Sequence, residues 1–284
     1  MSRLQEIEKQ VHGMEAMVQM SSVFEGIASM KIARIKNQVL QATVFFDDLW
    51  SIYTQIRVDS LFRFGRNTSS DKVIEKELFI IITAEGGFSG DIDQKLVRYM
   101  LEGFDENKQD IIVIGHHGAV QLAQKGVSFK KYFKLPSKDQ NINVSPIIKY
   151  VQQYKSASVF YQEYVSLMVQ DVRKIALSSA VDSIGKKSDK TDDFISEETY
   201  IFEPSTYVLV DHLERSMMQI ALEQLILDSK LAQYASRFRA MSASHQAADD
   251  QLGDVRLKYN RGKRAIKDER LKEIINGIKK AGVS

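Results

Sequence analysis

The stretch that decides the fold is LERSMMQIALEQLILDSKLAQYASRFRAMSASHQAADDQLGDVRLKYNRGKRAI, residues 213–266. Apolar side chains recur through it at alternating steps of three and four residues, and Gln224, His245 and Gly262 are the exceptions. A period of 3.5 residues sustained over so many turns is typical of a coiled-coil seam rather than of an ordinary surface helix. The seam residues that carry this prediction are Leu231, Phe238, Met241, Leu252 and Tyr259.

A second stripe with the same spacing runs from Leu4 to Ile56 and is interrupted only by Ser21 and Glu25. Two such helices at opposite ends of one chain most economically pair with each other, antiparallel, into a rod. We therefore expect a coiled-coil helix over residues 1–60 and another over residues 204–284. Because the second helix is the longer one, a single helix should project at one end of the rod. The N-terminal seam residues are Val11, Val18, Ile32 and Ile35.

Between the two stripes the hydrophobic period changes. Leu78–Thr83 and Ile111–Gly115 are continuous apolar runs, as expected of buried parallel strands. We expect further strands over Val127–Leu135, Tyr164–Val169 and Lys174–Ser183, and helices over Asp91–Glu102, Ala119–Gln124 and Val144–Ala157. This pattern predicts a small inserted α/β domain, a βαβ, Rossmann-like layered unit over residues 75–184. The polar and charged segment 185–199 is expected to be a mobile loop.

Composition narrows the class of protein. The formal net charge is only +2, which argues against a general nucleic-acid binder. The chain has no cysteine, so a cysteine-based metal site or a disulfide is excluded. Its apolar runs are too short to span a bilayer, and its start resembles neither a secretory signal nor a transit peptide. A cytosolic or cytosol-facing bacterial protein is the simplest interpretation.

Positive charge concentrates at the C-terminus. Residues 255–284 hold ten lysines and arginines against three acidic residues. Basic residues near a helix C-terminus interact favourably with the helix dipole, but that effect is confined to about the last turn. The cluster is much longer, so an acidic partner surface is the alternative interpretation.

The glycine-rich turn formed by Gly86, Gly87 and Gly90 follows a strand and precedes a helix, where phosphate-binding loops occur. Its glycine spacing fits neither the Walker nor the dinucleotide pattern, so a tight βα turn is favoured over nucleotide binding. His116 and His117 follow a strand and are expected in a solvent-facing turn. No catalytic group, metal site or cofactor is predicted.

Several motifs resemble the γ subunits of F-type ATP synthases. Residues 227–241 are similar to that family's LESKASEHAARMxAM, and residues 257–277 to its LxYNKARQA and EIVxGA segments. Residues 200–204 resemble its YxxEP, and residues 83–93 its SSDRGLCGGLN. Phe24 stands where the family has methionine, and Gly86 where it has arginine. The resemblance implies a divergent or alternative member of the family.

The resemblance also implies a role and a set of contacts. A central rotor shaft would turn inside a ring of α and β subunits and would bind the ε subunit and the membrane c-ring. It would be a non-catalytic subunit without a cofactor, peripheral to the cytoplasmic face of a bacterial membrane. The implied bearing residues at the tip are Leu271, Ile274, Ile275 and Ile278. The implied contacts with β subunits are Phe24, Arg237, Arg256, Lys263, Arg264 and Asp268.

Two other hypotheses stay open at this stage. A coiled-coil adaptor of another assembly would keep the rod but would need no ring of ATPases. A nucleotide-dependent enzyme would use the glycine turn, and it predicts nucleotide binding by the isolated chain.

Overall fold

The computed structural model describes residues 3–56, 74–135, 142–178 and 206–281. The predicted mobile loop, residues 185–199, lies outside these ranges. The chain divides into two compact units. The helical unit comprises Met1–Ile27 and Phe238–Ser284, and the sheet unit comprises Ala28–Arg237.

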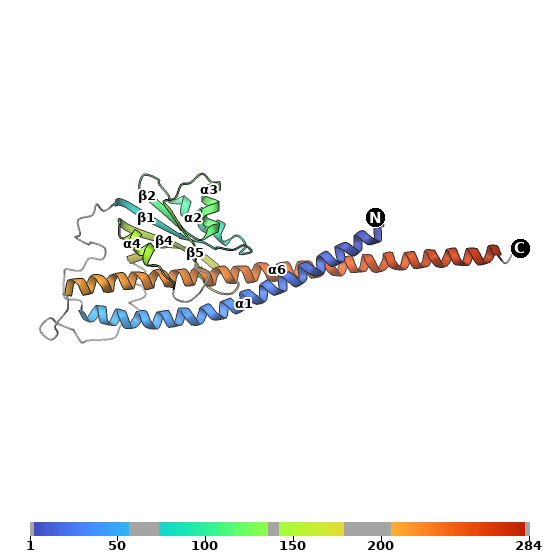
Figure 1. Ribbon diagram of the computed structural model, residues 1–284, viewed down its shortest axis with the longest axis horizontal. Coiled ribbons are helices and arrows are strands. Elements are labelled where there is room, and N and C mark those ends of the chain that lie inside the picture. The colour runs from blue at the N-terminus through green and yellow to red at the C-terminus, as the bar shows by residue number, and fades with distance from the viewer. Residues whose placement is uncertain (1–2, 57–73, 136–141, 179–205, 282–284) are drawn as a thin grey trace. The chain divides into compact units, whose positions relative to one another are not determined.

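Two long helices supply parts of both units. Helix α1 spans Arg3–Ile56, 54 residues, and helix α6 spans Thr206–Ala281, 76 residues (Figure 1). At 1.5 Å per residue they are about 80 Å and about 115 Å long. All three prolines lie at positions 136, 146 and 204, so neither helix contains the residue that most often breaks a helix.

Within the helical unit, the covered positions are those of the heptad stripes. On α1 the less exposed side chains include Leu4, Ile7, Val11, Met14, Val18, Ser21 and Glu25. On α6 they include Phe238, Met241, His245, Ala248, Leu252, Val255, Tyr259 and Gly262. Most of the remaining described positions of these two segments are exposed. The spacing read from the sequence therefore marks the faces through which these segments pack.

The two segments run antiparallel. The Nη2 of Arg256 lies 2.6 Å from the Oε1 of Glu15, and the hydroxyl of Tyr259 donates to Glu8 over 3.3 Å. Nearer the other end, the Nδ1 of His245 lies 3.8 Å from the Oε2 of Glu25. The partner's number on α1 falls as the number on α6 rises, as antiparallel helices require.

Beyond the start of α1, helix α6 continues without this partner. Gly262 lies beside Leu4, because a Cβ on Gly262 would be 3.1 Å from the Leu4 Cδ1. From residue 263 to residue 279 every side chain of α6 is exposed in this unit. The chain thus has a projecting C-terminal helix segment, as the different lengths of the two stripes predicted.

The sheet unit contains a five-stranded mixed sheet. Its strands are β1 (Ile74–Ile82), β2 (Gln109–Ile114), β3 (Lys131–Phe133), β4 (Tyr154–Tyr164) and β5 (Gln170–Ala176). Their order is β3-β2-β1-β4-β5, in which the first four strands are parallel and β5 is antiparallel to β4. The intervening helices are α2 (Ile92–Glu102), α3 (His116–Gln124) and α4 (Ser145–Val151). The predicted βαβ arrangement is present in β1, α2 and β2.

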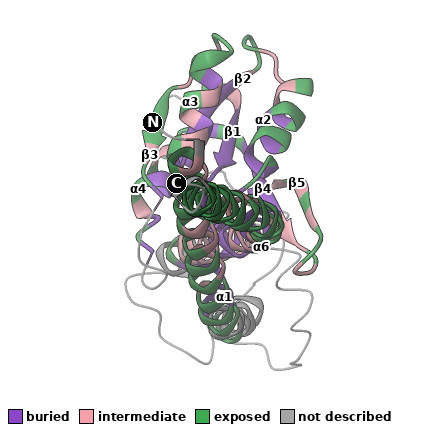
Figure 2. Cartoon of the chain, turned by 90° about the vertical axis from the view of Figure 1, so that its right-hand side faces the viewer, coloured by how far each residue is buried: buried purple, intermediate pink, exposed green. Residues whose placement is uncertain are grey.

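Both faces of the central strand are buried. Phe79 and Ile81 belong to a core that includes Leu96 of α2 and Leu122 of α3. The alternate side chains of β1, among them Ile80, are also fully buried. Figure 1 shows α6 beside the sheet, and Figure 2 shows the buried strands between their neighbouring helices. Over residues 221–236, α6 has no exposed side chain, which is typical of a helix with neighbours on several sides.

Five expectations about this unit were wrong in their bounds or type. The strand expected over Val127–Leu135 is only three residues long, β3 at Lys131–Phe133. The helix expected over Val144–Ala157 ends at Val151, and the eleven-residue strand β4 begins at Tyr154. Its aromatic and β-branched residues fit a buried strand beside β1, and that pairing outweighs the helical spacing. Residues 166–169, expected in a strand, instead form a turn closed by backbone hydrogen bonds between Ser166 and Val169.

The remaining two differences concern the edge strand β5 and the start of α3. Strand β5 begins at Gln170, earlier than the expected Lys174. Helix α3 begins at His116 rather than at Ala119, so the two histidines lie in a helical turn and not in a solvent-facing loop.

Gly115 offers a sharp test of this fold. It has a φ of 101°, and a Cβ there would collide with the carbonyl oxygen of Thr83. We expect Gly115→Ala to lower the free energy of unfolding of the sheet unit by about 3 kcal/mol or more, measured by denaturant unfolding. Gly103→Ala is the matched control, because nothing lies within 4 Å of a Cβ there. Equal stability of the two variants would contradict the described β2–α3 geometry.

Candidate functional site: a polar clamp between the sheet and helix α6

The site lies at the carboxyl end of the sheet, where the strand order reverses. From β1 the chain proceeds to β2 and β3 on one side, and then crosses to β4 on the other side of β1. In doubly wound sheets, ligands bind in the crevice at such a switch point. In this chain the glycine-rich turn after β1 and Gln162 near the end of β4 lie at this switch point.

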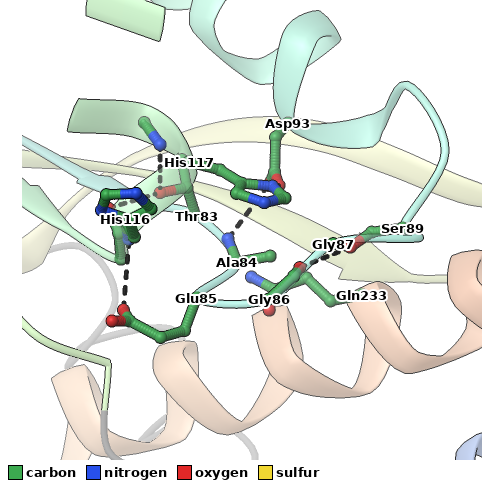
Figure 3. A network of polar contacts seen from close by, with 12 residues as sticks. Thr83, Ala84, Glu85, Gly86, Gly87, Ser89, Asp93, His116, His117 and Gln233 are labelled. Atoms are coloured by element: carbon green, nitrogen blue, oxygen red, sulfur yellow. Dashed lines mark hydrogen bonds and ion pairs between the residues drawn. The ribbon is translucent and has the colours of Figure 1, made fainter. Parts of the chain in front are cut away.

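Asp93 is at the centre of this site. It lies in the first turn of α2, where the helix dipole favours a carboxylate, and is only 3% exposed. Its Oδ1 accepts hydrogen bonds from the backbone N–H of Ala84 at 3.2 Å and from the Nε2 of Gln162 at 2.8 Å. Its Oδ2 lies 3.0 Å from the Nδ1 of His117, the second residue of α3 (Figure 3). One buried carboxylate thus joins α2, α3, β4 and the end of β1.

Gln162 carries these contacts to α6. It is fully buried, and its Oε1 accepts hydrogen bonds from the hydroxyl of Ser229 and, at 3.2 Å, from the Nε2 of Gln233. Ser229 and Gln233 are one helical turn apart and bond each other over 3.1 Å. The path from Asp93 to α6 is therefore made of consecutive hydrogen bonds between buried side chains.

A second group of contacts holds the glycine turn against the same helix. The hydroxyl of Ser236 donates to the carbonyl of Ser89 at 2.7 Å. The Arg237 guanidinium donates to the carbonyls of Gly87 at 3.0 Å and Gly86 at 3.1 Å. Gly90, with a φ of 66°, supplies a backbone conformation that side chains disfavour. We call Asp93, Gln162, Ser229, Gln233, Ser236 and Arg237, with the turn they hold, the polar clamp.

The first turn of α3 does not present open N–H groups to a phosphate. The backbone N–H of His116 donates to Glu85, that of His117 to the carbonyl of Ala84, and that of Gly118 to the hydroxyl of Thr83. These are the groups through which a helix N-terminus binds an anion. The chain itself therefore occupies the α3 N-terminus. The glycine turn precedes α2 instead, and the buried carboxylate of Asp93 in the first turn of α2 disfavours a phosphate there by like-charge repulsion.

Electrostatics reinforce the contact between α2 and α3. The hydrogen bond with Asp93 raises the pKa of His117, and this effect exceeds the opposing effect of partial burial. Glu85 adds a smaller increase, whereas the nearby Arg237 lowers the same pKa. His117 is therefore more easily protonated here than in the unfolded chain, and its charged form stabilises the clamp.

The sequence-derived contact residues fall in different places. Arg237 belongs to the clamp, and its guanidinium also lies 5.1 Å from the ring centre of Tyr234. Arg256 pairs with Glu15 in the helical unit, and the pKa of Glu15 is lowered by that hydrogen bond. Phe24 is half-buried in the same unit. The exposed residues of the projecting segment include Lys263, Arg264, Asp268, Leu271, Ile274, Ile275 and Ile278.

Sequence reasoning missed most of the clamp. Asp93, Ser229, Gln233 and Ser236 were not singled out, because polar residues on a helix usually face solvent. Gln162 was not singled out either, because it lies between the helix and the strand expected there. A signal was present in α6, where Ala221, Ala232, Ala235, Ser229 and Ser236 are small residues of the kind that permit close packing. Their concentration within sixteen residues indicated a second packing face beside the heptad stripe.

Solved structures with the same architecture define the class. A chain of the Euglena gracilis mitochondrial ATP synthase, in the assembly described as OSCP/F1/c-ring, superposes with a TM-score of 0.61 and 15% identity. The alignment covers 97% of this chain and 93% of that one. A chain of the rotor from the same organism gives a TM-score of 0.58 with 15% identity, over 93% of this chain and 98% of that one. The chain therefore shares the fold of these ATP synthase chains.

Sequence comparison gives the family. The ATP synthase family matches residues 3–280. The ATP synthase gamma chain of Mycoplasmoides gallisepticum is 22% identical over 99% of this chain and 100% of the relative. That of Chlorobium limicola is 23% identical over 98% of both. The chain belongs to the ATP synthase family, and the relatives it matches are gamma chains. None of the helices in the described ranges is long and apolar enough to cross a membrane.

The pKa of His117 leads to a test of the clamp. Because this pKa is raised on folding, the stabilisation is fully present below the unfolded value of about 6.5 and is lost as pH rises through the folded value. We expect His117→Asn to cost more stability at pH 5.5–6 than at pH 9. Thermal unfolding of both proteins across this range measures the difference. A penalty independent of pH would show that the charged pair does not stabilise the fold.

Proposed function

We propose that this chain is the central rotor shaft, the γ subunit, of an F-type ATP synthase. It couples ion-driven rotation of the c-ring to conformational change at the catalytic β subunits and does no chemistry itself. The observation that carries the proposal is the family match over residues 3–280, which includes both long helices and the inserted sheet. The described architecture adds a physical reason, because long helices without proline suit the transmission of torque.

In this proposal, residues 1–60 and 204–284 form one antiparallel coiled coil, and residues 75–184 form the domain on its side. The covered heptad positions and the contacts of Glu15 and Glu25 with α6 support the pairing. The described seam residues are half-buried or buried, as a knobs-into-holes interface requires. Its polar members, among them His245, fix the register of the two helices.

The projecting end of α6 is the proposed bearing tip. Leu271, Ile274, Ile275 and Ile278 are 59%, 60%, 45% and 67% exposed. Large apolar side chains gathered at one exposed site mark a surface that a partner covers. An apolar sleeve formed by the α and β subunits would bury them without fixing the rotational angle, because hydrophobic contact has no direction.

The proposed contacts with β subunits lie nearer the paired helices. Lys263 and Arg264 are exposed and cationic, Asp268 is exposed in the projecting segment, and Phe24 lies on α1. Arg256 and Arg237 each contact their own chain, so their proposed contacts with β subunits would add to these bonds or replace them. Exposed charge pairs contribute little individually, so the coupling energy is distributed over several residues.

The same proposal also assigns partners to the α/β domain. The α/β domain binds the ε subunit and the c-ring, and one copy of the chain serves each complex. The protein is then peripheral to the cytoplasmic face of the membrane. As the shaft turns, each β subunit meets a different side of it, and differential contact sets the population of each β conformation.

If the projecting end of α6 is a bearing, substitutions there should impair assembly with the α and β subunits without impairing folding. We expect replacement of Leu271, Ile274, Ile275 and Ile278 by glutamine to leave the thermal unfolding of the isolated chain nearly unchanged, because these side chains are exposed. Binding to the α and β subunits should weaken, measured by co-purification. Replacement of Lys272, Glu273 and Asn276 on the same turns is the control. Undiminished binding by the tip variant would exclude a bearing role.

The cationic contacts predict a loss of coupling. The combined variant Arg256→Ala, Lys263→Ala and Arg264→Ala should lower the torque developed during ATP hydrolysis, while each single substitution has a small effect. Single-molecule rotation of the assembled complex measures this torque. Lys9→Ala and Lys31→Ala on α1 provide a charge control. Full torque in the triple variant would contradict the proposed contacts.

Co-expression with the cognate α and β subunits tests the function as a whole. We expect a complex that hydrolyses ATP and contains one copy of this chain. A stable homodimer that does not bind the α and β subunits, seen by analytical ultracentrifugation, would instead support the hypothesis of a coiled-coil adaptor.

A further inference from the structure

The bonds of the polar clamp have a direction that one residue sets. An ionised Asp93 accepts hydrogen bonds but cannot donate them. Gln162 must therefore turn its Nε2 toward Asp93 and its Oε1 toward α6. Ser229 and Gln233 can then only donate to that oxygen, as they do. A carboxylate on α2 thus determines the arrangement of side chains on α6, a helix more than a hundred residues away in the sequence.

Directional bonds suit a joint that must resist turning. Apolar contact between the sheet and α6 supplies stability, but it allows two smooth surfaces to slide because it has no preferred angle. Hydrogen bonds weaken steeply when their angle changes, and they are stronger in a buried site than in water. The clamp bonds α6 at two places along its axis, through Ser229 with Gln233 and through Ser236 with Arg237.

We propose that Asp93 is the positioning residue of a torque-bearing joint, in which the polar clamp prevents the sheet from turning or sliding on α6. The inference rests on the proposed rotor function and assigns a mechanical role to a contact within the chain. Load taken up by the α/β domain passes through Gln162 and the glycine turn into α6. His117 is the ionisable group in contact with Asp93, and the charges of Glu85 and Arg237 act on His117 in turn.

Stall torque in the assembled complex tests the joint when the load is attached to the sheet unit. The sequence has no cysteine, so Lys108→Cys, whose side chain is 77% exposed, gives a unique attachment point for a bead. We expect Asp93→Ala to lose stall torque because the bead then pulls on a loosened domain. Amide exchange at Ala84 should also become faster, on the order of a hundredfold, because its acceptor is gone.

Two matched variants separate positioning from stability. Asp110→Ala removes another buried carboxylate of the sheet, which bonds Tyr154 and Lys76 but makes no described contact with α6. It should lower the unfolding temperature yet keep the torque. Asp93→Asn should restore torque at pH 8, because its oxygen can still accept from Ala84 and Gln162 while its amide donates to neutral His117.

The outcomes are distinct. If Asp93→Ala fails to fold, Gln233→Leu removes the α6 side of the same path and should show the same loss of torque. Equal torque in wild type, Asp93→Ala and Gln233→Leu would overturn the joint, as would an equal loss in Asp110→Ala. If the unaltered chain drives no rotation at all, the proposed rotor function is wrong, and the proposal of a torque-bearing joint is then wrong as well.

Discussion

The rest of the structure depends on the packing of α6, which contacts the sheet in the sheet unit and α1 in the helical unit. In the sheet unit, residues 221–236 of this helix are covered almost completely, partly by the polar clamp. In the helical unit, the same helix presents a heptad face to α1. A single continuous helix thus meets two different kinds of surface. One contact is largely apolar and periodic, and the other is polar and specific to a few residues.

The sheet has the strand order of a ligand-binding architecture, but contacts within the chain lie at its switch point. The strand order places a switch point between β1 and β4, where a nucleotide would be expected in a doubly wound fold. Here Ser229 and Gln233 of α6 bond Gln162 near the end of β4, and Arg237 of α6 bonds the glycine turn after β1. The site has become a place of attachment within the chain. Fold alone would have suggested binding chemistry that these contacts disfavour.

The sequence predicted the features that repeat and missed those that do not. The heptad stripes were predicted because a period of 3.5 residues is visible locally, and the same positions are covered in the helical unit. Strand β4 was misassigned because its start, Tyr154–Ala157, continues a short helical pattern, and only pairing with β1 identifies it as a strand. The clamp's contacts with α6 join residues separated by 67 to 151 positions, for example Gln162 with Ser229 and Gly86 with Arg237. No local pattern reports such partners, whereas the motif resemblance did identify the family.

Cryo-electron microscopy of the complex that co-purifies with a tag on this chain tests the central claim most directly. We expect one copy of the chain, with residues 271–278 of α6 enclosed by a ring of alternating α and β subunits. We also expect α1 antiparallel to α6 in the same copy, with Glu15 beside Arg256. Two copies paired with each other, or a chain lying outside the ring with its C-terminal helix exposed, would contradict the account.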